Sequence, residues 1–136
     1  MYSFDILSHT ADTKIRVIAD TKQELFTGAL NGMFAIMEPL SIDDAMAQER
    51  RLTIQSPDIE SLLVDFLSEA LYMSDVYNEW YDRVSFAICT DNEIDATVHG
   101  RKIKQLKGVE VKSVTYHELE VKHTDGSWHA VIVFDI

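Results

Sequence analysis

The stretch Trp128-His129-Ala130-Val131-Ile132-Val133-Phe134, or WHAVIVF, lies near the end of the chain and decides the fold class. Alternate residues of a strand point to opposite faces. One face of this strand would carry Trp128, Ala130, Ile132 and Phe134, and the other Val131 and Val133. Strands that are apolar on both faces are typical of the middle of a sheet. The stretch therefore predicts a central strand.

The rest of the chain contains further strand and hairpin signals. Strands are expected near 109–122, and Asp125-Gly126 is a tight-turn signal that predicts a hairpin before the final strand. Apolar or alternating runs predict further strands at 3–7, 13–19, 50–55, 84–88 and 94–98. The total is about seven strands, and hairpins dominate the second half of the chain.

Two amphipathic helices complete the pattern. Thr21-Lys22-Gln23-Glu24 is a capping box, and Pro39 marks the end of the helix that follows it. Gly28 and Gly32 within that helix indicate close packing against a sheet. Ser56-Pro57-Asp58 predicts the start of the second helix, with Ser56 as its cap. The sequence therefore predicts one α+β domain over residues 1–136, in which two helices pack on one side of a mostly antiparallel sheet.

Composition excludes several classes of protein. The net charge of −11 disfavours a surface that binds nucleic acid nonspecifically, and Arg101-Lys102-Ile103-Lys104 with Lys107 and Lys112 is the only dense basic region. No apolar run is long enough for a membrane helix, and the N-terminal residues do not resemble a signal peptide. The single cysteine, Cys89, excludes an internal disulfide, and the cytoplasm is the expected location.

Motifs for common enzyme chemistry are missing. The five glycines form neither a P-loop nor a dinucleotide fingerprint, and the sequence contains no GxSxG or HExxH. Cys89 lies within a predicted strand, which favours a structural thiol over a nucleophile. Carboxylates near the two ends of the chain are the remaining candidates.

Asp12 and Asp135 are the carboxylates that stand out. Asp12 closes the stretch Asp5-Ile6-Leu7-Ser8-His9-Thr10-Ala11-Asp12, and Asp135 follows the central strand directly. If Ile136 is the natural end, the terminal carboxylate lies beside Asp135. Converging carboxylates repel one another unless a cation such as Ca²⁺ or Mg²⁺ binds them. The pattern predicts a divalent-metal site if the two ends meet.

Simpler interpretations stay open at each of these positions. Asp12 is also typical of a turn, Asp135 of a solvated chain end, and Lys112 of a solvent-facing strand. A metal-dependent phosphoester hydrolase would use His9 as a general base beside the acids. The aromatic and acidic segment at 72–82 indicates either a helix end over the core or a docking loop of a chaperone-like binding protein.

Four motifs in the same order resemble one family. They are His9-Thr10-Ala11-Asp12, Leu62-Leu63-Val64-Asp65-Phe66-Leu67, Lys112-Ser113-Val114-Thr115-Tyr116-His117 and Phe134-Asp135-Ile136. Together they resemble the archeases, accessory proteins of RNA-splicing ligases. The chain departs from many archeases at Asp20, where a glycine is frequent, and in the basic loop that begins at Gly100.

The resemblance implies a strand–helix–strand–strand module with an insertion, and a protein that is not itself an enzyme. It implies activation of an RtcB-type ligase, which uses Mn²⁺ and GTP to join tRNA halves, by promoting its guanylylation and multiple turnover. tRNA would be contacted only through the ligase. Asp12, Lys112 and Asp135 would be the residues essential for activation. Asp12, Asp135 and the main chain of Ile136 would bind the metal, expected to be Ca²⁺ in the isolated protein, with Mn²⁺ or Mg²⁺ as alternatives.

Overall fold

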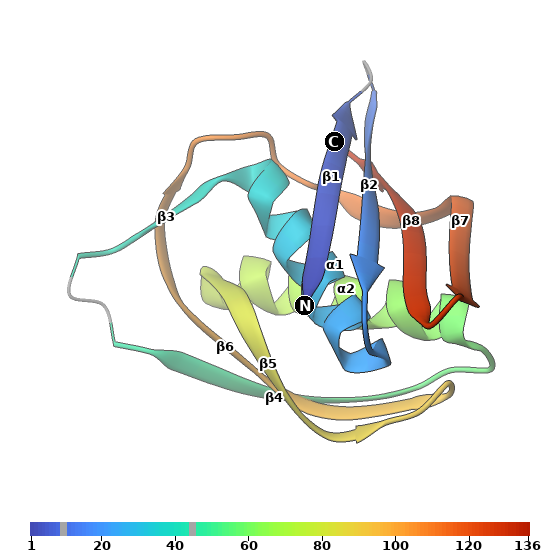
Figure 1. Ribbon diagram of the computed structural model, residues 1–136. Helices are drawn as coiled ribbons and strands as arrows, with labels where there is room; N and C mark the ends of the chain where they lie inside the picture. Colours follow the sequence, from blue (N-terminus) through green and yellow to red (C-terminus); the bar gives the residue numbers. More distant parts are fainter. Residues whose placement is uncertain (9–10, 44–45) are drawn as a thin grey trace.

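The computed structural model describes residues 1–8, 11–43 and 46–136, and these ranges contain two helices and eight strands. In chain order the elements are β1 (Tyr2–Ser8), β2 (Asp12–Ala19), α1 (Lys22–Met37), β3 (Pro39–Ser41), β4 (Gln48–Gln55), α2 (Ile59–Tyr77), β5 (Glu79–Cys89), β6 (Glu93–Leu106), β7 (Ser113–Thr124) and β8 (Ser127–Asp135). Figure 1 shows β1, β2, β8 and β7 side by side, with the two helices behind them.

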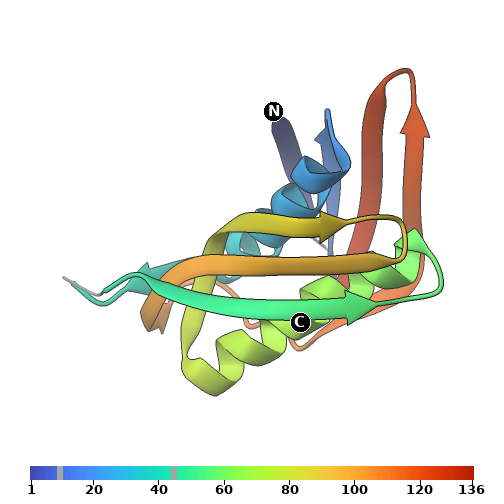
Figure 2. The ribbon, with the colours of Figure 1, turned by 90° about the horizontal axis from the view of Figure 1, so that it is seen from below.

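The strands form two antiparallel sheets. The first has the order β1-β2-β8-β7, so β8 is the central strand that its apolar faces predicted. In the second sheet β6 pairs with β3, β4 and β5. Both helices pack between the sheets, and one core contains side chains from all these layers (Figure 2). The predicted α+β fold of two helices on antiparallel strands is confirmed, with the strands divided between two sheets.

Three strand boundaries differ from the sequence prediction. β5 begins at Glu79 rather than near residue 84. β6 continues to Leu106 rather than ending near residue 98, and the strand expected near 109–122 begins only at Ser113. Residues 99–106 are mostly polar, and Ile103 is the one buried residue among them, so the alternation that reveals a strand is weak there. The loop at 107–112 is held instead by main-chain bonds from Lys107 and Gly108 to the end of α1.

α1 begins and ends where the sequence predicted. The Thr21 hydroxyl accepts a hydrogen bond from the Glu24 N–H at 3.1 Å, and Glu38 adopts the left-handed conformation that ends the helix before Pro39. Gly28 and Gly32 face β1 and β2. A Cβ atom at Gly28 would lie 2.8 Å from Val17 Cγ1, and one at Gly32 would lie 2.9 Å from Ile15 Cδ1. The two glycines therefore allow the close helix–sheet contact that was expected.

α2 begins two residues later than predicted. Asp58, not Ser56, is the cap, because its carboxylate accepts a hydrogen bond from the Ser61 N–H at 2.7 Å. The Ser56 hydroxyl donates to Asp65 on the helix instead, at 2.7 Å. The 72–82 segment includes the end of α2 and the start of β5, so it is not a loop, and the helix end packs over the core as one of the two interpretations expected.

A buried carboxylate joins the second sheet to the end of α2. Glu79 is fully buried and accepts two hydrogen bonds from Arg50, at 3.0 and 2.9 Å, and one from the Tyr81 hydroxyl at 2.8 Å. Burial alone would raise the pKa of Glu79, but these bonds hold it below its usual range. The Arg50 guanidinium also lies 3.7 Å from the centre of the Tyr77 ring. The network fixes the end of α2 against β4 and β5.

Neither helix in the described ranges is long and apolar enough to cross a membrane.

Candidate functional site

Asp12 and Asp135 meet at one end of the first sheet. They are direct cross-strand partners in the register of β2 and β8. The next pair, Thr13 and Phe134, is buried and points into the core. Since side chains alternate along a strand, both carboxylates lie on the outer face of the sheet. The core thus holds the backbone of both strands in place one residue from the acids.

Ser113 extends this row to a third strand. It is the β7 partner of Asp135, and its hydroxyl donates a hydrogen bond to Asp135 Oδ2 at 2.9 Å. Sequence reasoning missed Ser113, although the residue lies within the Lys112–His117 motif. Only the strand register shows that this serine, rather than another in the chain, reaches the acid. Asp12, Ser113, Asp135 and Ile136 are called the tip below.

Lys112 contacts the tip through its backbone. It precedes β7, so it is not a strand residue, and its main-chain N–H donates to the Asp135 carbonyl at 2.8 Å. Its side chain is exposed and makes no ion pair within the described part of the chain. The structure brings the backbone of Lys112 to Asp135 without bringing its ammonium to a carboxylate.

Ile136 continues directly from the acid pair. Its side chain is half-buried and packs against the core. The packed side chain holds the main-chain oxygens of Ile136 next to Asp135.

The donor set at the tip suits a hard divalent cation. Asp12 and Asp135 are like charges directly opposite each other, an arrangement that destabilises a sheet. Lys14, the next residue on the same face of β2, is engaged by Glu118 at 3.1 Å. Carboxylate and main-chain oxygens are the ligands of Ca²⁺ and Mg²⁺. A bound cation would therefore relieve the repulsion.

Side chains alone do not complete such a site. Among residues 1–8, 11–43 and 46–136, no group of three or more His, Cys, Asp or Glu side chains could hold a metal ion. Ca²⁺ takes about six to eight oxygen ligands. A cation at the tip would thus depend on main-chain oxygens and would keep positions open for water or another molecule.

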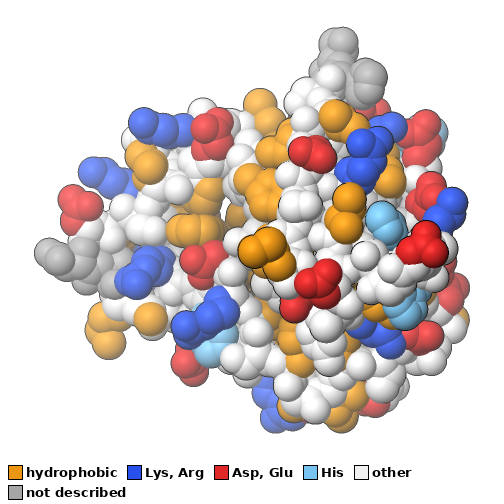
Figure 3. Space-filling view, viewed as in Figure 1, with side chains coloured by type: hydrophobic (Ala, Val, Ile, Leu, Met, Phe, Trp, Pro, Cys, Tyr) orange, Lys and Arg blue, Asp and Glu red, His pale blue; other side chains and the backbone are white. Residues whose placement is uncertain are grey.

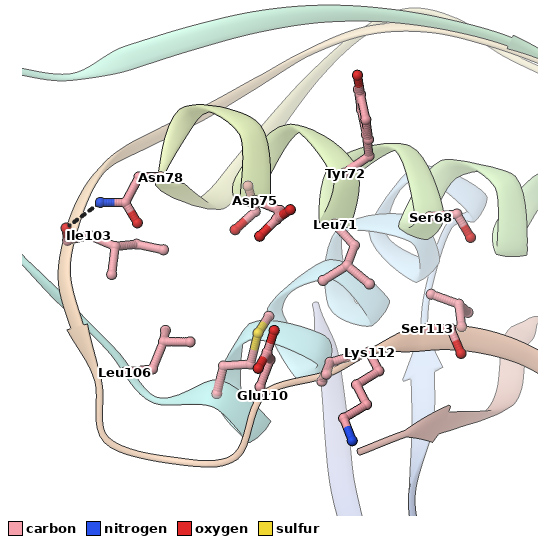
Figure 4. A pocket seen from close by; sticks show the side chains of 14 residues that line it. Ser68, Leu71, Tyr72, Asp75, Asn78, Ile103, Leu106, Glu110, Lys112 and Ser113 are labelled. Atoms are coloured by element: carbon pink, nitrogen blue, oxygen red, sulfur yellow. Dashed lines mark hydrogen bonds between the residues drawn. The ribbon is translucent and has the colours of Figure 1, made fainter.

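A groove lies beside the tip, between the second half of α2 and the loop before β7. It encloses about 490 Å³ and is lined by Lys112 and Ser113 at one end. Figure 4 shows Asp75 of α2 and Glu110 of the loop on opposite sides of the opening. The groove therefore ends at Ser113, whose hydroxyl donates to Asp135.

The described histidines and the cysteine are weaker candidates for a functional site than the tip. His9, the general base of the hydrolase hypothesis, lies outside the described residues. His99 Nε2 is 2.9 Å from the Ser85 hydroxyl and its Nδ1 is 3.4 Å from Glu49, which resembles a nucleophile–base–acid row. The row lies on an exposed strand surface, and no residue of the groove belongs to it. Burial raises the pKa of the half-buried Cys89 thiol, so the thiol stays protonated, as expected of a structural cysteine.

Comparisons with known proteins show similarity over almost the whole chain. The model of the archease protein family (MTH1598/TM1083) matches residues 4–136. The archease of Methanosarcina mazei is 35% identical over 98% of this chain and 95% of its own length. The archease of Methanothermobacter thermautotrophicus is 33% identical over the whole of both chains.

The chain belongs to the archease family.

Solved structures confirm the archease fold. Methanobacterium thermoautotrophicum protein 1598, a solution structure, superimposes with a TM-score of 0.75 at 28% identity, covering 98% of both chains. A crystal structure of an archease from Thermotoga maritima, described as a possible chaperone, gives a TM-score of 0.72 at 22% identity over 96% of this chain and 94% of its own. The second likeness supports the fold alone. The resemblance seen in the four sequence motifs is thereby confirmed.

Proposed function

We propose that this archease is a non-catalytic activator of an RtcB-type tRNA-splicing ligase, and that it acts through a divalent cation held at the tip. The observation that carries the proposal is the direct cross-strand pairing of Asp12 with Asp135. Two residues that are 123 positions apart, as their numbers show, meet at the end of a core-anchored sheet. Together with family membership, this arrangement supports a role for both acids in activation.

Each residue of the tip has a distinct task in this proposal. Asp12 and Asp135 would bind the cation through their carboxylates, and Ile136 through its main chain. The Ser113 hydroxyl orients the Asp135 carboxylate by donating to one of its oxygens. When bound, the cation, Ca²⁺ in the isolated protein or else Mn²⁺ or Mg²⁺, would supply positive charge with open coordination positions to the ligase active site.

Charge supports an indirect relation to tRNA. The chain carries a net charge of −11. Within its basic region, Lys102 donates to the Tyr77 carbonyl and lies 3.5 Å from the Glu79 carboxylate. On the face seen in Figure 3, acidic and basic side chains are interspersed. The ligase, and not this protein, would therefore bind the tRNA in the cytoplasm.

A guanylylation assay of the purified ligase tests the proposal. Asp12→Ala and Asp135→Asn should lower the stimulation by at least roughly 10-fold, because loss of one ligand weakens the metal site. Asp82→Asn is the matched control, since Asp82 is an exposed acid on β5, away from the tip. Stimulation by Asp12→Ala equal to that by the wild-type protein would contradict the proposal.

A chaperone-like binding function is the second candidate. Tyr72, Val76 and Tyr77 on α2 are 62%, 52% and 40% exposed, which is unusual for large apolar side chains on one helix. The Thermotoga maritima relative is described as a possible chaperone. This function predicts partner binding that persists in a chelator, whereas activation through the tip requires the metal.

A further inference from the structure

The groove between α2 and the loop before β7 has an apolar floor. Figure 4 shows side chains from both elements converging on it. The apolar residues that line it are Met37, Leu71, Ile103, Leu106, Val111 and Val114. With a volume of about 490 Å³, it is large enough for two or three side chains of another protein.

The mouth of the groove is acidic. Asp75 and Glu110 approach it from opposite sides (Figure 4), and both are exposed. Within the described ranges neither carboxylate takes part in an ion pair. Two unpaired carboxylates over an apolar floor are complementary to a cationic side chain with apolar neighbours.

Large apolar side chains continue around the rim. Tyr72 of α2 and Leu106 of β6 both line the groove and are 62% and 38% exposed. Val76 and Val109 follow Asp75 and precede Glu110 in the sequence and are 52% and 48% exposed. Exposed apolar residues gathered around a groove mark interaction surfaces rather than ordinary solvent-facing positions. The apolar surface therefore extends beyond the groove itself.

The groove is continuous with the tip. Ser113 and Lys112 line it, and these residues also bind Asp135, one through the hydroxyl and the other through the main-chain N–H. A protein whose active site meets the cation at the tip would lie directly beside the groove. Lys112 makes the end near the tip less acidic than the mouth between Asp75 and Glu110.

We propose that the groove docks a segment of the ligase protein that carries a lysine or arginine flanked by apolar side chains. The cationic group would lie between Asp75 and Glu110, and its neighbours would cover the apolar floor. This inference rests on the proposed function, because it takes the ligase as the partner. RNA is a poorer occupant since the two acids repel phosphate, and a second copy of this chain is disfavoured by the net charge of −11.

The test compares three variants in binding to the purified full-length ligase. Asp75→Asn/Glu110→Gln removes both charges of the mouth, and Tyr72→Ala removes an apolar part of the rim. Asp82→Asn/Asp125→Asn is the matched control, because it removes two exposed acids elsewhere, and asparagine suits the left-handed conformation of Asp125. Thermal unfolding checks that all variants stay folded, which is expected because every changed side chain is exposed.

The mouth variant should bind the ligase more weakly but still activate it at saturating concentration. The mouth variant should raise the Kd for the ligase roughly 10-fold at low salt and less at high salt, since the lost attraction is screened. Tyr72→Ala should raise it by a similar factor at both salt concentrations. The control should stay within about twofold of the wild type. At saturating concentration the mouth variant should still stimulate guanylylation, because its tip is intact.

Other outcomes decide against the inference. An unchanged Kd for the mouth variant overturns it and leaves the proposed function standing, whereas wild-type protein that neither binds nor stimulates the ligase overturns both. If the mouth variant binds tRNA more tightly with unchanged ligase binding, the groove faces RNA instead. If the wild-type protein sediments as a dimer and the mouth variant as a monomer, the groove joins two copies of this chain.

Discussion

Asp12 of β2 and Asp135 of β8 lie directly opposite each other across two adjacent antiparallel strands, one residue beyond the buried pair Thr13 and Phe134. The core therefore brings two negative charges together on the outer face of the sheet. Like charges in this position destabilise a sheet unless a cation balances them.

Calcium should stabilise the protein through this pair. A ligand that binds only the folded state at about 100 times its Kd adds ~2.7 kcal/mol to the free energy of unfolding. For a domain of this size, the melting temperature should rise by on the order of 10 °C. Asp12→Asn should abolish the rise, and in a chelator it should be more stable than the wild type by about 0.5 kcal/mol because the repulsion is relieved. A calcium-dependent rise of equal size in both proteins would contradict the site.

Ser113→Ala should weaken calcium binding without unfolding the protein. The hydroxyl donates to Asp135 Oδ2, and loss of a group that orients a metal ligand reduces metal affinity by roughly 10-fold. Thr115→Val is the control, because Thr115 lies on the same strand and its hydroxyl bonds the Val133 carbonyl at 2.9 Å. Calorimetric titration should show a raised calcium Kd for Ser113→Ala alone. Equal losses in the two variants would indicate a general effect on β7.

The fold was predictable where one physical signal dominated. The apolar faces of 128–134 identified the central strand, and the capping box at Thr21 identified the start of α1. The second sheet was less visible, because β3 has three residues and the end of β6 is mostly polar. The predicted cap of α2 was wrong because serine and aspartate are both good caps. Only the folded chain shows that the Ser56 hydroxyl donates a hydrogen bond to Asp65 instead.

The sequence singled out the two acids of the candidate site, but it did not predict how they are arranged. Chemistry and family resemblance selected Asp12 and Asp135, but their meeting depends on the register of β2 and β8, which no local pattern encodes. The role of Ser113 also depends on strand register, because the sequence does not distinguish it from other serines near the start of a strand. The groove combines residues from α1, α2, β6, β7 and the loop before β7, so its lining appears only after folding.

Gly28→Ala should destabilise the protein more than Gly32→Ala. Alanine gains helix propensity of about 1 kcal/mol at either position, but a new Cβ overlaps a neighbour. At Gly28 the neighbour is Val17 Cγ1 at 2.8 Å, on a stiff β-branched side chain, and Tyr2 Cδ1 is at 2.9 Å. At Gly32 it is Ile15 Cδ1 at 2.9 Å, the end of a longer side chain.

Urea unfolding measures this difference. Gly28→Ala should lose about 1 kcal/mol net, and Gly32→Ala should stay within about 0.5 kcal/mol of the wild type. Equal stability of Gly28→Ala and the wild type would show that α1 can move away from β2.

Glu79→Gln should destabilise the protein at neutral pH and make its free energy of unfolding less dependent on pH in acid. The folded-state pKa of Glu79 is lowered, so its contribution is fully present above the unfolded value near 4.5 and is lost as the pH falls through the lower folded value. Breaking a buried ion pair costs about 3 kcal/mol. Urea unfolding at pH 7 and at pH values below about 4.5 should show the two proteins converging in acid. A constant difference in stability across this range would contradict the assignment.

Lys112→Ala should separate metal binding from activation of the ligase. The Lys112 ammonium makes no ion pair in the described ranges, although its backbone is bonded to Asp135. Its removal should therefore leave the calcium Kd unchanged, or lower it up to about threefold because a nearby positive charge is lost. Stimulation of ligase guanylylation should nevertheless fall by roughly 10-fold, as expected when one charged contact to a partner is removed. Lys107→Ala, at an exposed lysine of the same loop, is the control and should stimulate normally. A raised calcium Kd for Lys112→Ala would instead place the lysine in the metal site. An equal loss of stimulation in Lys112→Ala and Lys107→Ala would show that only the net charge of the protein matters.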